Sequence, residues 1–185
     1  MGKLIYSMIT SVDGYVCDED GNFGWGVPDE ESHRFIGERS KSVGTYLMGR
    51  RMYEVMSYWE TAHELAGEPA VVHEFARVWQ AADKVVYSTT LTGVTTGRTR
   101  LERTFEPEAV RKLKESDDRD ITIEGPTLAA QAVKAGLVDE YQLIVAPALA
   151  GGGTPFFPQG VRAELELIED RSFPNGMAFL RYAVK

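Results

Sequence analysis

The segment from Ile121 to Ala135 reads Ile-Thr-Ile-Glu-Gly-Pro-Thr-Leu-Ala-Ala-Gln-Ala-Val-Lys-Ala, and it predicts a strand, a sharp turn and a helix. The β-branched run favours a strand, and the alanine-rich run has high helix propensity. Gly125 lets a ligand approach the backbone, while Pro126 suits a first helical turn. Unpaired N–H groups at such a helix start attract anions, phosphates above all. An ordinary turn with nothing bound explains the same residues, because the glycine spacing does not match a nucleotide-binding motif.

The same order of strand, glycine and helix recurs earlier in the chain. Val43 to Met48 is predicted to be a strand, and Gly49-Arg50-Arg51 connects it to a helix from Met52 to about Trp59. A third short strand, Lys84 to Tyr87, runs into Ser88-Thr89-Thr90. Three predicted strands therefore end in groups that suit an anion.

These strand ends are expected to meet, because the carboxyl ends of the strands form the ligand crevice of an open α/β sheet. A dinucleotide would use the helix starts for its pyrophosphate, the hydroxyls as neutral donors and a guanidinium for a terminal phosphate. The alternative for Arg50 and Arg51 is that both are ordinary surface arginines.

The remaining pattern predicts a single α/β domain over residues 1–185, with a mostly parallel sheet and an antiparallel edge at the C-terminal end. A helix over Pro69 to Ala82 is expected to use its apolar stripe for core packing. The other expected elements are strands at Leu4–Ile9, Arg98–Glu102, Tyr141–Ala146, Leu165–Glu169 and Met177–Val184, and helices from Pro28 or Asp29 to Arg39 and at Pro107–Glu115.

Two glycine-rich or turn-rich segments lack periodicity. Residues 18–28 predict a long loop in which Phe23 and Trp25 serve as anchors, and loops of this length are often functional. The triple glycine at 151–153 allows the backbone to approach a flat ligand closely, and a flexible loop explains it equally well.

Composition narrows the class of protein. With 185 residues, 43% hydrophobic and 26% charged, and without a long apolar run, the chain is expected to be a cytoplasmic protein that does not span a membrane. The single cysteine, Cys17, excludes an internal disulfide, and three histidines make a metal site unexpected. The net charge of −8 argues against nucleic acid as a partner.

Four blocks of the sequence occur together in an order that is specific in combination. They are Ser11 to Tyr15, Tyr46 to Glu54, Val86 to Thr89, and Glu124 to Leu128 followed by residues 136–140 and Ala146-Pro147. In these blocks the chain resembles the dihydrofolate reductase superfamily, and within it the reductase domain of riboflavin biosynthesis and its stand-alone relatives. The resemblance covers nearly the whole chain.

The resemblance implies the dihydrofolate reductase-like fold, a three-layer α/β structure with a central, mostly parallel mixed sheet. It also implies NADPH as the cofactor and a homodimer as the assembly. Carried over residue by residue, the cofactor contacts would be Gly49, Arg50, Arg51 and Met52 at the phosphates, Tyr87, Ser88 and Thr89 at the adenosine end, Gly125, Pro126, Thr127 and Leu128 at the pyrophosphate, and Ile9 and Val16 by the nicotinamide.

Two departures bear on the substrate. Ala82 stands where an arginine would clamp the folate tail, and Glu124 stands where many relatives have the first of two glycines. Folate is therefore disfavoured. The expected function is NADPH-dependent reduction of a small polar heterocycle, pyrimidine- or pterin-like, with or without a ribosyl group.

Hydride transfer also needs a proton source near the receiving atom. We expect Asp13 or Glu30 to supply it, although Asp13 also suits a turn and Glu30 also suits a first helical turn. The alternative for the whole chain is a nucleotide-binding module of the same fold that performs no chemistry, which a loop filling the pocket with Phe23 or Trp25 would favour.

Overall fold

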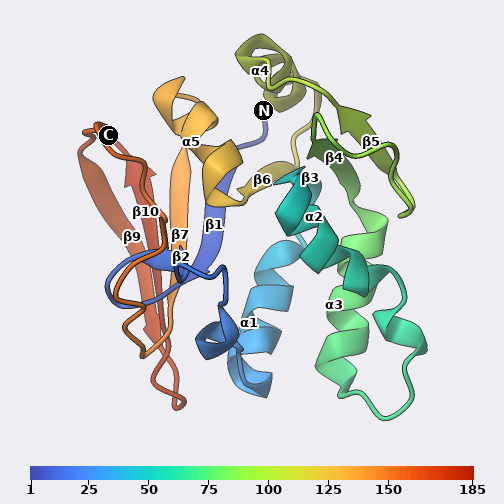
Figure 1. Cartoon of the computed structure of the whole chain (residues 1–185), viewed down its shortest axis with the longest axis vertical. Coiled ribbons are helices and arrows are strands. Elements are labelled where there is room, and N and C mark those ends of the chain that lie inside the picture. Colours follow the sequence, from blue (N-terminus) through green and yellow to red (C-terminus); the bar gives the residue numbers. More distant parts are fainter.

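A computed structural model describes residues 1–185 and contains a central eight-stranded sheet in the order β5-β4-β3-β6-β1-β7-β10-β9 (Figure 1). Only β10 runs against its neighbours; all other adjacent pairs in the sheet are parallel. This confirms the predicted mixed sheet with an antiparallel C-terminal edge. The strands are β1 Leu4–Thr10, β3 Val43–Gly49, β4 Asp83–Tyr87, β5 Thr99–Glu102, β6 Asp120–Glu124, β7 Glu140–Val145, β9 Leu165–Ser172 and β10 Ala178–Val184.

Helices cover both faces of the sheet and complete the three predicted layers (Figure 1). The helices α4 (Pro107–Ser116) and α5 (Pro126–Lys134) pack on one face, where they share a hydrophobic cluster with β1, β3, β4, β6 and β7. The helices α1 (Glu30–Ser40), α2 (Arg50–Met56) and α3 (Ala70–Ala81) lie on the other face. None of these helices is long and apolar enough to cross a membrane.

Strand β6 divides its side chains between the two faces, as the two-residue period of a strand requires. Ile121 and Ile123 are buried in the cluster beneath α5. Thr122 and Glu124 point to the opposite face, together with Tyr46, the neighbour of Thr122 in β3. The strand is thus apolar towards α5 and polar towards α1.

Helix α2 differs from its prediction at both ends. It begins at Arg50, directly after its N-cap Gly49, rather than at Met52. It ends at Met56, and a 3₁₀ turn over Ser57–Glu60 continues the chain. Arg50 and Arg51 therefore occupy the first helical turn and not the loop before it.

The triple glycine serves the packing of the chain on itself. The strands β2 (Tyr15–Cys17) and β8 (Thr154–Pro155) form a separate two-stranded sheet that was not predicted from the sequence. A Cβ added at Gly153 would lie 2.1 Å from the Cys17 carbonyl oxygen, and the φ of Gly153 is +117°. At Gly153 the close approach is therefore to backbone, not to a ligand.

The loop over residues 18–28 also differs in part from its prediction. Trp25 is half-buried against the cluster formed by Ile144 and Phe179, so it is an anchor. Phe23 is 48% exposed and is not one. Trp25 lies within a short 3₁₀ turn, Gly24–Gly26, and Phe23 directly precedes that turn.

We expect Gly153→Ala to destabilise the protein by more than about 3 kcal/mol, because the new methyl group must displace backbone atoms and adopt a backbone angle that other residues avoid. Gly151→Ala is the matched control, since Gly151 has φ +76° but open space around it. That control should lose only about 1–2 kcal/mol. Urea denaturation of both variants measures the difference, and equal losses would contradict the packing role of Gly153.

Candidate functional site

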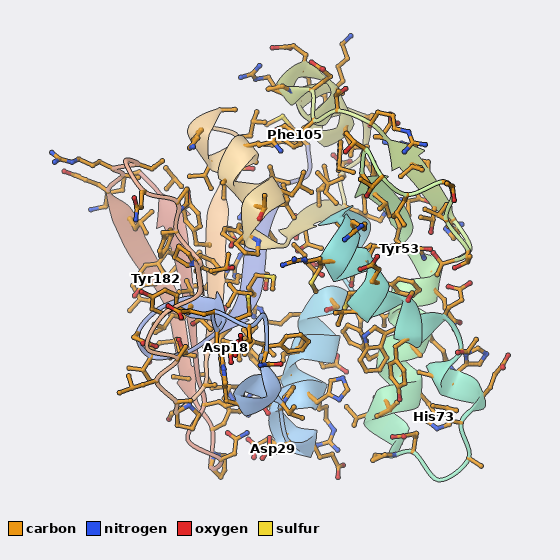
Figure 2. The ribbon with its side chains drawn as sticks, viewed as in Figure 1. Asp18, Asp29, Tyr53, His73, Phe105 and Tyr182 are labelled. Carbon is orange, nitrogen blue, oxygen red and sulfur yellow. The ribbon has the colours of Figure 1, made fainter.

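A cavity of about 1240 Å³ lies where β3, β4 and β6 end, and it continues between the sheet and α1. The helix after β3 packs on one face and the helix after β6 on the other, so a crevice opens between these neighbouring strands. Phe105 and Pro28 both line the cavity; Figure 2 places Phe105 near the upper end of the molecule and Asp29, beside Pro28, near the lower end. The cavity is larger than most small-molecule sites.

The structure brings all the residues assigned to the cofactor into this cavity. They come from five separate parts of the chain and now line a single continuous space. They are Ile9, Val16, Gly49, Arg50, Arg51, Met52, Tyr87, Ser88, Thr89, Gly125, Pro126, Thr127 and Leu128.

The turn between β6 and α5 has the geometry of an anion site. Gly125 has φ +94°, a backbone conformation that favours glycine, and Pro126 occupies the first turn of α5. The Gly125 N–H contacts the Met8 sulfur at 3.3 Å. The N–H groups of Thr127 and Leu128 follow at the helix start, where the helix dipole favours negative charge.

The second part of this end is built from α2 and the segment after β4. The Arg50 guanidinium donates to the Thr90 hydroxyl at 3.2 Å, and Ser88 Oγ accepts from the Thr90 and Leu91 N–H groups at 3.2 and 3.0 Å. Arg103 donates to the Ser88 and Leu91 carbonyls at 2.9 and 2.6 Å and also lines the cavity. Sequence reasoning missed Arg103, since no motif surrounds it.

The opposite part of the cavity is apolar and aromatic. Trp25, His33, Phe35, Trp59 and Phe75 line it. The His33 ring lies 5.4 Å from the Trp59 ring and 5.5 Å from the Phe75 ring, and burial lowers the pKa of His33. Such a lining suits a flat, uncharged group.

Between the two ends, Glu124 presents a carboxyl group that has no charged partner. Its Oε2 is fully shielded and makes no hydrogen bond, and the hydroxyl of Thr122 beside it is likewise unpaired. Burial raises the pKa of Glu124 to about 8. Burial and then the charge of Glu124 raise the pKa of Tyr46, which lies on β3 across from Thr122. At neutral pH the Glu124 side chain is thus mostly a neutral carboxylic acid.

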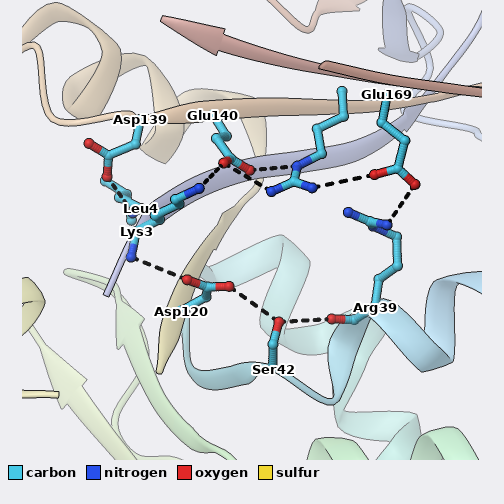
Figure 3. A network of polar contacts seen from close by, with 9 residues as sticks. Lys3, Leu4, Arg39, Ser42, Asp120, Asp139, Glu140 and Glu169 are labelled. Carbon is cyan, nitrogen blue, oxygen red and sulfur yellow. Dashed lines mark hydrogen bonds and ion pairs between the residues drawn. The ribbon is translucent and has the colours of Figure 1, made fainter. Parts of the chain in front are cut away.

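Glu140, on the same sheet face, shows what pairing does to a buried carboxylate (Figure 3). Burial favours its neutral form, but hydrogen bonds from Arg181 and Lys3 outweigh that effect and lower the pKa of Glu140. Arg181 reaches both oxygens of Glu140 at 2.8 and 3.0 Å, and Lys3 lies at 2.5 Å. Glu169 continues the chain of ion pairs from Arg181 at 3.3 Å to Arg39 of α1 at 2.9 Å.

Asp13 and Glu30, the residues expected to supply a proton, both lie outside the cavity. The Asp13 oxygens accept the Ala150 and Gly151 N–H groups at 3.0 and 2.8 Å. The Ser11 side chain and these two N–H groups lower the pKa of Asp13 to about 2, so it holds no proton at neutral pH. Glu30 is exposed and pairs with Arg34 at 2.5 Å. The structure favours the turn and helix-start roles for these two residues.

Comparison with known proteins identifies relatives over the full chain. The family model described as the RibD C-terminal domain matches residues 2–179. YyaP, an uncharacterized protein of Bacillus subtilis (strain 168), is 24% identical over 184 residues, which cover 97% of this chain and 94% of YyaP.

Two solved structures share the fold. A pyrimidine reductase-like protein of Corynebacterium diphtheriae superposes with a TM-score of 0.66 at 18% identity, covering 100% of this chain and 92% of its own. The second is a diaminohydroxyphosphoribosylaminopyrimidine deaminase/5-amino-6-(5-phosphoribosylamino)uracil reductase of Thermotoga maritima, with a TM-score of 0.66 and 13% identity. The match covers 100% of this chain but only 57% of that longer protein.

We expect Glu124→Gln to stabilise the protein increasingly as the pH rises. Because the folded state holds the Glu124 proton up to about pH 8 and the unfolded chain releases it near the usual value of 4.5, wild-type stability falls between these two values. The variant should gain up to a few kcal/mol at about pH 9 and nothing at about pH 4. Glu115→Gln, exposed on α4, controls for the loss of one charge. A pH-independent difference in urea denaturation would contradict the buried, unpaired carboxyl.

Proposed function

The chain belongs to the RibD C-terminal domain family, and on that premise we propose that it is an NADPH-dependent reductase of a small polar heterocycle, pyrimidine- or pterin-like. The observation that carries this proposal is the single cavity that joins the start of α5 and the side chains of Arg50 and Arg51 to an aromatic end. A dinucleotide cofactor needs the first end, and a flat substrate needs the second.

The residues at the anionic end fit a phosphorylated dinucleotide. The start of α5 offers N–H groups to a pyrophosphate, and the positive φ of Gly125 turns the backbone so that no side chain intervenes. Arg50, already in contact with Thr90, can bind the phosphate that distinguishes NADPH from NADH. The Ser88 and Thr89 side chains lie beside it in the cavity.

The aromatic end supports a heterocyclic substrate. NADPH supplies a hydride when bound; the chain's own residues bind both partners, orient them and exclude water. Ile9 and Val16 give the centre of the cavity an apolar wall, and Trp25 closes it from the long loop. A pyrimidine ring matches the names of the Corynebacterium and Thermotoga relatives, which supports that substrate class.

A nucleotide-binding module without chemistry remains the second candidate, because Phe23 and Trp25 both line the cavity. Two facts favour the reductase. The loop leaves about 1240 Å³ open, and a buried, unpaired acid faces that space. A module whose loop fills the substrate side would leave room only for its nucleotide and would need no such acid.

We expect NADPH to bind about tenfold to a hundredfold more tightly than NADH, because a charge-assisted contact to the extra phosphate contributes roughly 1.5–3 kcal/mol. Arg50→Ala should remove most of this difference. Arg111→Ala, on α4 and outside the cavity, makes the same charge change and should leave the preference intact. Calorimetry at one salt concentration measures all six affinities, and equal binding of the two cofactors by the wild type would contradict the phosphate assignment.

We expect dihydrofolate to be reduced poorly or not at all even when NADPH binds. Ala82 is buried at the end of α3, and neither Arg98 nor Arg100 lines the cavity, so none of the three can clamp the tail carboxylate. Losing a bidentate contact weakens binding about a hundredfold. NADPH absorbance with dihydrofolate as substrate provides the test; turnover near an ordinary rate of about 10 per second would refute the substrate assignment.

A further inference from the structure

We propose that Gln142 of β7 recognises the ring of the substrate: its side-chain amide pairs with a ring edge on which an N–H group stands beside a C=O group, as in a uracil-type ring. The inference rests on the proposed reductase function and narrows its substrate to heterocycles that carry such a lactam edge. It assigns a role in specificity to a residue that no motif in the sequence singles out.

Gln142 is a buried polar residue without a partner in the chain. It lines the cavity and is only 8% exposed. Its amide makes no hydrogen bond, unlike that of Gln80, whose Nε2 donates to the Trp59 and Glu60 carbonyls at 3.2 and 2.7 Å. A buried amide costs free energy unless a partner satisfies it, so a ligand in the cavity is expected to supply that partner.

The Gln142 amide is also open to the cavity. The protein completely shields the unpaired oxygens of Tyr46, Thr122 and Glu124, but it leaves the oxygen and the nitrogen of the Gln142 amide accessible. Both groups of the amide can therefore reach a ligand without any movement of the protein.

The neighbours of Gln142 in the sheet leave its amide free. Ser7 of β1 and Arg181 of β10 are its register partners on either side, and both line the cavity. The Arg181 guanidinium donates to Glu140 at 2.8 and 3.0 Å and to Glu169 at 3.3 Å, so its donors are already used. The Ser7 hydroxyl makes no hydrogen bond within the chain and offers a ligand a second polar contact beside the amide.

Gln142 lies beside the apolar wall of the cavity. Ile144 is two residues farther along β7, on the same face of the sheet, and it packs in a cluster with Phe179 and Trp25. A flat ring held against this wall would turn its edge towards Gln142. The amide would therefore meet the rim of the ring and not its face.

A primary amide matches a lactam edge by two hydrogen bonds. The Gln142 oxygen accepts from the ring N–H, and the Gln142 nitrogen donates to the ring C=O. A ring whose nitrogens carry methyl groups has no N–H to offer, so the buried oxygen would stay unpaired. Sites built to hydrogen-bond a ligand reject such analogues because of that loss.

A bound water and the carboxamide of the cofactor offer the same kinds of donor and acceptor. Water would satisfy the amide without any selectivity between rings. The carboxamide would make Gln142 a determinant of the affinity for NADPH. Selectivity between two rings and affinity for NADPH are therefore the quantities that separate the three partners.

Calorimetry with two small probes tests the proposal. The probes are 5,6-diaminouracil and its 1,3-dimethyl analogue, in which methyl groups replace both ring N–H hydrogens. The wild type should bind the first probe about tenfold to a hundredfold more tightly. Gln142→Met keeps the length of the side chain and removes the amide, so it should lose this difference, whereas a clash with the methyl groups alone would persist. Gln159→Met, in an exposed turn outside the cavity, is the matched control and should keep the difference.

A second variant, Gln142→Leu, guards against misfolding of the first. Both variants replace an unpaired buried amide by an apolar side chain of similar size, so both should be at least as stable as the wild type in urea and lose the selectivity. Unfolding of both variants would show that the amide holds the fold together and would overturn the proposal.

The outcomes separate the role of Gln142 from the reductase. Equal affinities of the wild type for the two probes, binding of neither probe, or selectivity retained in Gln142→Met would each overturn the role of Gln142. The Kd of Gln142→Met for NADPH should stay within about threefold of the wild-type value; a larger rise with intact selectivity would make Gln142 a cofactor contact and refute the proposal. A wild type that distinguishes the probes but neither binds nor oxidises NADPH would overturn the reductase and keep the recognition of the ring edge.

Discussion

The backbone angle of Gly125 is the constraint on which the site depends. A positive φ at the end of β6 sends the chain into α5 on one face of the sheet, while β3 sends the chain into α2 on the other. Residues with a Cβ rarely adopt that angle, so the turn requires glycine. The crevice exists because the chain leaves these two neighbouring strands towards opposite faces of the sheet. This divergence positions the start of α5, the Arg50 side chain and the Glu124 carboxyl.

The same sheet face contains two buried glutamates in opposite states. Glu140 is ionised because Arg181 and Lys3 surround it, and the resulting ion pairs tie β7, β10, β9 and α1 together (Figure 3). Glu124 has no such partners and keeps its proton. An unpaired buried acid destabilises the fold at neutral pH, so a structural explanation for it is lacking. Acids of this kind are found at functional sites far more often than elsewhere.

The sequence predicted the parts of the site that depend on local pattern. A strand, a glycine and a helix start are neighbours along the chain, and the rule that strand ends meet at one edge was enough to bring Gly49, Ser88 and Gly125 together. The state of the acidic residues could not be predicted in this way. The acidic signal at Asp13 is local, but its contacts are not, because Asp13 accepts N–H groups about 137 residues away. The β2–β8 pairing was missed for the same reason, because it joins Tyr15 to Pro155.

Glu124 shows most clearly what a local sequence pattern cannot predict. Its place before Gly125 was visible as a departure from the usual glycine pair, and it was used only as an argument about the substrate. Its protonation state depends on α1, β3 and β1 covering the carboxyl without bringing a cation near it, and no pattern within the strand encodes that.

The distribution of charge in the cavity also favours one orientation of a bound ligand. Arg50, Arg51 and Arg103 line the cavity at the α2 end, where an anionic tail would bind, whereas Trp25, Trp59 and Phe75 line its opposite part. Negative charge develops on the substrate heteroatom as a hydride arrives, so an ionised carboxylate beside it would oppose the reaction. A neutral acid at that position would cause no such repulsion. The absence of a cation beside Glu124 is therefore what keeps the carboxyl neutral, since an arginine there would favour its ionised form.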